Sequence, residues 1–151
     1  MNEELMTAAV EDTQQELPAL TLEDFLAANQ VNEDMTMDVV ISNRLKDFTF
    51  TIELFNKKQH ENYLNASIIR NGSGKIIKQN LKLFNELVVI NHCRYPNFKA
   101  VDFLNKLGAS TPQEALYKTL KVGEIDLLAN KIMEFNGYDE EYSKLYHDAK
   151  N

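Results

Sequence analysis

The sequence has one cysteine and three histidines, and this scarcity excludes several kinds of site. Cys93 alone cannot form an internal disulfide, and its position on an apolar segment predicts a buried, unreactive thiol. His60, His92 and His147 lie on separate segments without metal-ligand spacing, so we expect no metal site. Adjacent side chains on a helix point about 100° apart, so His92 and Cys93 do not form a nucleophile and its base.

Long apolar runs and catalytic motifs are also missing. No stretch approaches the roughly 18 apolar residues of a membrane-spanning helix, and the N-terminus has acidic residues where a signal peptide needs basic ones. We therefore expect a soluble protein made in the cytosol, with no membrane contact. The segment Gly72–Lys75 (GSGK) fails as a nucleotide loop, because Ile69 stands at the preceding glycine position and Ile76 where Ser or Thr should follow. With no G-x-S-x-G or H-E-x-x-H motif either, we expect no cofactor and no catalysis.

Basic residues are missing from the first part of the chain. Residues 1–38 hold ten of the 23 acidic residues and no Lys or Arg, whereas residues 44–82 hold eight Lys or Arg against three acidic residues. This locally positive middle segment is suited to bind a partner with an acidic surface. A sequence pI of about 5.0, and aromatic residues that alternate as in a strand core, argue against nucleic acid as that partner.

The most apolar stretch is Leu81–Cys93 (LKLFNELVVINHC), and it predicts a central helix against which the rest packs. The block Leu87–Ile90 is equally compatible with a buried strand, because periodicity cannot assign a short β-branched run. Length favours the helix, which has Asn80 as a candidate cap and stops before Pro96.

Residues 1–20 are acidic without a sustained apolar period, so we expect a flexible leader. A short helix opens at Thr21, and Leu22, Phe25 and Leu26 form one apolar stripe on it. Two interpretations of the stripe stay open. It packs on the domain's own core, or it binds a partner as a helix in a groove.

Alternating apolar residues over 37–41 and 48–54 predict an antiparallel hairpin, covered on its apolar face by the central helix. A helix follows, with Asn56 and Gln59 as a capping box. We interpret residues 71–78, which contain Gly72 and Gly74, as a mobile basic connection that becomes ordered on a partner.

Three more helices are predicted in the C-terminal half. The first spans about 101–107 and is ended by Gly108. The second is opened by the capping box Thr111-Pro112-Gln113-Glu114. The third spans about 125–135, is preceded by Gly123 and is ended by Gly137. The predicted fold class is α+β: a mainly helical domain of five to six helices with a small antiparallel β-hairpin. We expect one domain over 21–138, between the leader 1–20 and a charged C-terminal tail 139–151.

Four stretches then carry a family resemblance, at 20–29, 39–47, 88–99 and 123–140. With the order of the elements between them, the chain resembles the XkdN-like tail assembly chaperones of tailed phages and phage-derived tail particles of Gram-positive bacteria. The resemblance covers roughly residues 20–151. Its most specific part is GEIDLLANKIMEFNGYDE at 123–140, where Gly-Glu opens a helix that Phe-Asn-Gly closes before an acidic tail.

The resemblance implies a non-enzymatic assembly factor that binds the tape measure protein and keeps it soluble until the tail tube polymerises around it. It also implies self-association along the tape measure, the tail tube protein as a further partner, and a place in the bacterial host cytoplasm but not in the mature particle. The alternative is a small structural component retained in the phage or tailocin tail.

Such an assembly factor needs apolar helical surface to bind the tape measure protein and net charge to stay soluble. The segments most free to supply them are the short helix at 22–26, the connection at 71–78 and the tail at 142–146. The alternative for each segment is that its side chains close the domain's own core. The predicted partner-binding residues are Leu22, Phe25, Leu26, Lys75, Lys78, Tyr142, Leu145 and Tyr146.

Overall fold

The computed structural model describes residues 21–28 and 30–138. The chain divides into two compact units, Met1–Asn32 and Glu33–Asn151. In the first unit, α2 (Leu22–Ala28) is a helix with no buried residue. The Thr21 hydroxyl accepts a hydrogen bond from the Asp24 amide at 3.1 Å, which confirms the predicted helix start.

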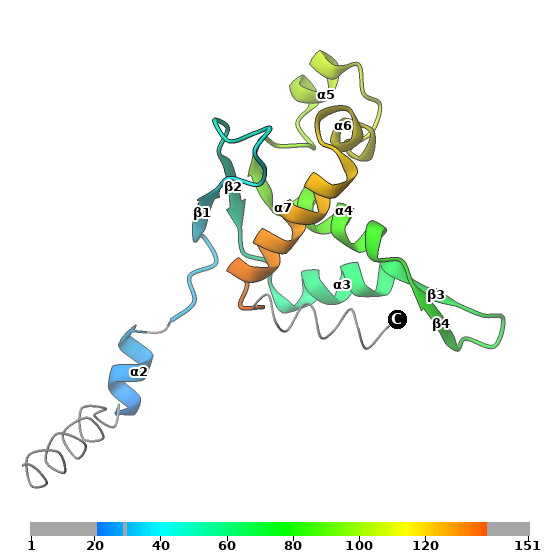
Figure 1. The fold of residues 1–151 in the computed structure, drawn as a ribbon. Helices are drawn as coiled ribbons and strands as arrows, with labels where there is room; N and C mark the ends of the chain where they lie inside the picture. Colours follow the sequence, from blue (N-terminus) through cyan, green and yellow to red (C-terminus); the bar gives the residue numbers. More distant parts are fainter. Residues whose placement is uncertain (1–20, 29, 139–151) are drawn as a thin grey trace, which may run out of the picture. The chain divides into compact units, whose positions relative to one another are not determined.

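The second unit is mainly helical with small antiparallel sheets, which confirms the predicted α+β class (Figure 1). Its elements, in chain order, are β1 (Thr36–Val39), β2 (Phe50–Glu53), α3 (Lys57–Ser67), β3 (Ile68–Arg70), β4 (Ile76–Gln79), α4 (Leu81–His92), β5 (Cys93–Tyr95), α5 (Val101–Leu107), α6 (Pro112–Thr119) and α7 (Val122–Phe135).

Helix α4 is the predicted central helix, and it packs against α7, α3 and α6. Its buried side chains surround the helix, as expected where neighbours lie on several sides. The Asn80 side chain caps it by accepting a hydrogen bond from the Leu83 amide at 3.1 Å. The helix ends at His92, one residue earlier than predicted, because Cys93 begins β5.

The main sheet has three strands in the order β1-β2-β5, all antiparallel. The predicted hairpin is confirmed, with Thr36 opposite Glu53 and Val39 opposite Phe50. The third strand, β5, was not predicted, because three residues are too few to show an alternating pattern. The pattern at 48–54 overstated the strand, since β2 begins only at Phe50 and leaves Phe48 in the connection before it.

The prediction of a mobile connection at 71–78 is wrong. Helix α3 stops at Ser67, and β3 and β4 form a second antiparallel hairpin that extends away from α3 and α4 (Figure 1). Its turn is closed by the Asn71 side chain, which accepts hydrogen bonds from the amides of Ser73 and Lys75, both at 3.0 Å. The prediction missed that paired isoleucines flank this turn on both sides.

Most local capping signals elsewhere were accurate. Asn56 and Gln59 form the predicted capping box of α3, and Gly108 ends α5 in the left-handed conformation at φ 66°. Thr111 caps α6, but the Glu114 carboxylate accepts from the Ser110 amide rather than from the capping residue. Helix α7 already begins at Val122, which places Gly123 in its first turn instead of before it.

Candidate partner-binding groove

An apolar groove with a volume of about 550 Å³ opens on the second unit where three connections meet. The first is the β1–β2 connection, the second is the turn from β5 into α5, and the third is the end of α6. We call it the aromatic groove. Its lining residues are Leu45, Phe48, Phe50, Tyr95, Pro96, Asn97, Phe98, Ala100, Asp102, Phe103, Lys106, Thr119 and Leu120.

Stacked aromatic rings form one wall of the aromatic groove. The Phe48 ring packs edge-on against Phe50, with centroids 4.9 Å apart, and stacks on Tyr95 at 6.1 Å. Phe50 is buried, whereas Phe48 is 37% exposed and Tyr95 is 61% exposed. Apolar surface of this kind, held in place by a buried ring beneath it, is suited to bind an apolar partner side chain.

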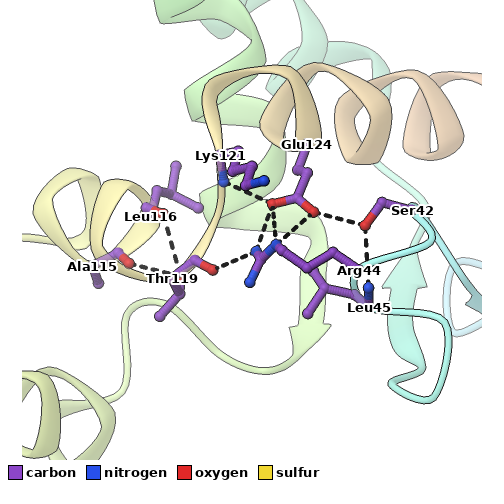
Figure 2. Close-up of polar contacts among 8 residues, drawn as sticks. All are labelled: Ser42, Arg44, Leu45, Ala115, Leu116, Thr119, Lys121 and Glu124. Carbon is purple, nitrogen blue, oxygen red and sulfur yellow. Dashed lines mark hydrogen bonds and ion pairs between the residues drawn. The ribbon is translucent and has the colours of Figure 1, made fainter.

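A network of three side chains, Ser42, Arg44 and Glu124, holds two walls of the groove together (Figure 2). The Glu124 carboxylate accepts hydrogen bonds from the Arg44 guanidinium at 2.5 to 3.1 Å and from the Ser42 hydroxyl at 2.7 Å. The same carboxylate accepts from the Lys121 amide at 2.8 Å, at the start of α7. We call this set the Glu124 network.

The Glu124 network reaches the groove through two further hydrogen bonds (Figure 2). Arg44 donates to the Thr119 carbonyl at 3.0 Å, and the Leu45 amide donates to the Ser42 hydroxyl at 3.3 Å. Leu45 and Thr119 both line the groove, so the network joins the β1–β2 connection to the end of α6. It therefore fixes the distance between these walls.

Electrostatics stabilise the network in its charged form. The hydrogen bonds from Arg44 hold the pKa of Glu124 at about 2, against the opposing effect of burial, and the Ser42 hydroxyl adds to the decrease. The same pairing raises the pKa of Arg44. Glu124 is therefore ionised across the physiological range, and its buried charge is matched by the guanidinium.

His92, at the end of α4, and Cys93, at the start of β5, lie inside the core instead of in the groove. Burial lowers the pKa of His92 to about 4, and its Nε2 lies 2.8 Å from the Tyr63 hydroxyl. Burial raises the pKa of Cys93 to about 12, and its thiol donates to the Tyr95 carbonyl at 3.4 Å. The predicted burial of Cys93 is confirmed. A thiol protonated at neutral pH is a poor nucleophile.

The predicted partner-binding residues that the structure describes are not among the lining residues of the aromatic groove. Leu22, Phe25 and Leu26 are exposed together on α2. Lys75 and Lys78 are exposed together on the β3–β4 hairpin, at the end of its turn and within β4. The predicted residues of the tail, Tyr142, Leu145 and Tyr146, lie outside the described residues.

Sequence reasoning missed the groove residues for a simple reason. Phe48 was assigned to the predicted strand because it continues the alternation of Phe50 and Ile52. Tyr95 lies between the end of the predicted central helix and Pro96, where the sequence predicted no element. The only available signal was the aromatic residue beside that proline, which does not identify its spatial neighbours.

Comparison with known proteins gives the family. A family model described as "Phage XkdN-like tail assembly chaperone protein, TAC" matches residues 22–150. The chain belongs to this family. The match confirms the resemblance carried by the four stretches, and it includes the whole aromatic groove and the Glu124 network.

A curated relative and a solved structure are similar to this chain over most of its length. The protein YqbN of Bacillus subtilis (strain 168), named as uncharacterized, is 28% identical over 138 residues, which cover 84% of this chain and 91% of YqbN. A crystal structure of the protein YqbN has a TM-score of 0.57 at 21% identity. It covers 81% of this chain and 100% of its own, and it supports the fold.

Membership of this family indicates a role as a chaperone in phage tail assembly. Across residues 21–28 and 30–138, the helices are all too short or too polar to cross a membrane. In the same described ranges, no three His, Cys, Asp or Glu side chains gather in a way that could hold a metal ion.

Proposed function

We propose that this tail assembly chaperone binds the tape measure protein and keeps it soluble while the tail tube assembles. The observation that carries the proposal is an open, aromatic-walled groove on a member of a tail assembly chaperone family. The proposal includes self-association of the chaperone along the tape measure and the tail tube protein as a further partner. Nucleic acid and membranes are not partners in it.

The groove has the chemistry that such a partner needs. A tape measure protein is a long helical chain with exposed apolar seams, and an amphipathic helix binds by laying its apolar face into a hydrophobic groove. Phe48 is 37% exposed and Tyr95 is 61% exposed. Covering both rings removes about 200 Å² of apolar accessible surface from water. This burial contributes roughly 5 kcal/mol to the free energy of binding before the entropic costs of association.

The proposal is tested by co-expressing this chain with the tape measure protein of the same phage or tail particle. The expected result is that the tape measure moves into the soluble fraction and co-purifies with several copies of the chaperone. The double variant Phe48→Ala, Tyr95→Ala should abolish both effects if the groove is the binding surface. The single variant Tyr95→Ala, which removes an exposed ring, should reduce recovery with little loss of fold stability.

A matched control separates the groove from apolar surface in general. Val122 and Leu127 are exposed on α7 and do not line the groove. The variant Val122→Ala, Leu127→Ala should leave tape measure recovery unchanged, and urea unfolding should show that all the variants fold. An insoluble tape measure in the presence of abundant, folded wild-type chaperone would refute the proposed function.

The proposed location is the cytoplasm of the bacterial host, with the protein absent from the finished particle. Quantitative mass spectrometry of purified particles tests this against the alternative of a retained structural component. A chaperone should be present in purified particles at far below one copy per tail. Stoichiometric recovery would instead assign the chain to the tail itself.

A further inference from the structure

The net charge of the chain is confined to its first unit. Met1–Asn32 contains seven of the 23 acidic residues and no Lys, Arg or His. The other 119 residues contain 16 acidic and 16 basic residues, so the formal charge of −7 comes entirely from the first unit. This unit is therefore an acidic segment attached to a body of balanced charge.

The β3–β4 hairpin has the opposite character. No acidic residue occurs between Glu61 and Glu86, and the hairpin and the residues next to it contain the four basic residues of that interval, Arg70, Lys75, Lys78 and Lys82. Three isoleucines of the hairpin, Ile69, Ile76 and Ile77, are 42% to 60% exposed. We call the surface formed by these seven residues the basic hairpin.

The geometry of the basic hairpin places its charged and apolar groups side by side. Ile69 pairs with Lys78 across the two strands, and Arg70 pairs with Ile76. Residues opposite each other in an antiparallel pair project from the same face of the sheet. A two-stranded hairpin is marginally stable by itself, so an apolar partner that covers its isoleucines would also stabilise it.

The first unit offers the complementary surface. Leu22, Phe25 and Leu26 are exposed on α2, and Glu23 and Asp24 lie in its first turn. An acidic, apolar helix matches a basic, apolar hairpin both in charge and in the surface that each would remove from water.

We propose that the acidic helix α2, in the first unit of one copy, binds the basic hairpin of a second copy. The proposal rests on the self-association that the proposed function includes, and it names the contact. Since the two surfaces differ, the interface is heterologous, and each bound copy still offers one free surface of each kind. Copies therefore add head to tail into an open chain, as a protein that coats a long partner requires.

The test uses the purified full-length protein alone, in sedimentation velocity over a range of concentrations. At about 50 mM salt we expect concentration-dependent growth beyond a dimer. The variants Lys75→Glu, Lys78→Glu and Glu23→Lys, Asp24→Lys replace attraction by repulsion, and each should weaken association at least about tenfold. Near 1 M salt the Debye length falls to about 3 Å, so the wild type should also dissociate.

Mixing the two reversed variants is the decisive step. Each has one native and one reversed surface, so an equimolar mixture restores charge complementarity at both kinds of contact. Association should return to within a few-fold of the wild type. The matched control Lys57→Glu, Lys58→Glu makes the same charge change at the exposed N-terminus of α3, and it should associate as the wild type does.

A monomer at all concentrations, or reversed variants that associate normally, would overturn the proposal. These outcomes are distinct from failure of the proposed function, because no tape measure is present. If the hairpin reversal instead abolishes tape measure solubility while self-association is unchanged, the basic hairpin binds the tape measure and not a second copy. That result overturns this proposal and leaves the proposed function intact.

Discussion

Replacing Glu124 by glutamine tests whether the Glu124 network maintains the fold around the groove. The amide keeps the shape of the carboxylate, but its NH₂ group must face one set of donors. In the best orientation the NH₂ group takes the place of Glu124 Oε2 and donates to the Ser42 hydroxyl. The NH₂ group then faces Nε of Arg44, a second donor, which lies 3.0 Å from Oε2 in the wild type. A buried acceptor for a charged donor is therefore lost.

The magnitude follows from this loss. A hydrogen bond to a charged group contributes about 1.5 to 3 kcal/mol. The Arg44 side chain is 42% exposed and that of Glu124 is 6% exposed, so solvent screens part of the interaction. We expect Glu124→Gln to lower the free energy of unfolding by about 2 kcal/mol. At about 2 to 4 °C per kcal/mol, the melting temperature should fall by roughly 4 to 8 °C.

The pH dependence adds a signature that a packing defect would not give. The pKa of Glu124 is about 2 in the folded protein, below the roughly 4.3 of an unperturbed glutamate. Below pH 4.3 the unfolded chain binds more protons at this site than the folded one, so the stabilisation falls as the pH decreases towards 2. Urea unfolding of the wild type and of Glu124→Gln from pH 7 to pH 3 should show that the difference between their free energies of unfolding decreases.

The matched control is Glu61→Gln, which removes an exposed carboxylate whose i,i+4 pairing with Lys57 spans 3.9 Å. It should change the free energy of unfolding by less than about 0.5 kcal/mol. A Glu124→Gln protein as stable as the wild type, or a difference between them that stays constant from pH 7 to pH 3, would refute the reasoning.

Three further predictions concern the core and the backbone. The thiol of Cys93, buried and with its pKa raised to about 12, should resist alkylation at pH 8 until urea unfolds the protein. The pKa of His92 is lowered to about 4 by burial, so NMR should show a neutral ring at pH 6, and its contribution to stability should fall as the pH drops from about 6.5 to 4. Gly108→Ala should cost about 1 kcal/mol in urea unfolding because its φ is 66°, whereas Gly123→Ala in α7 should be neutral or stabilise by about 0.5 kcal/mol.

The sequence predicted those parts of the fold that depend on neighbours within a few residues. The caps at Asn56, Asn80 and Thr111 were identified correctly because a side-chain oxygen three residues before a free amide is a local arrangement. The apolar run of α4 was identified because its length exceeds that of an ordinary strand. The β1–β2 hairpin was identified from its alternation.

The β3–β4 hairpin was missed because two competing local signals overlap. Ile68 also fits the apolar side of the preceding helix, and the glycines at 72 and 74 suggest a flexible loop. What decides the structure is the pairing of Ile68 with Gln79, together with a 2.7 Å hydrogen bond from the Asn80 amide to the Ser67 carbonyl. These contacts join the end of one helix to the start of the next, and the paired isoleucines on both sides of the turn are the local pattern that indicates this pairing.

The candidate site was missed for a related reason, which also explains its location. Arg44 and Glu124 are 80 residues apart, and the groove whose walls they connect exists only where three connections meet. The apolar faces of α3, α6 and α7 are already packed against α4, so apolar surface available to a partner has to come from other parts of the unit. Phe48 and Tyr95 at the connections and the isoleucines of the basic hairpin supply it. Binding surface that lies outside the packing of the core can be changed by substitution without unfolding the domain, which makes the proposed variants informative about binding.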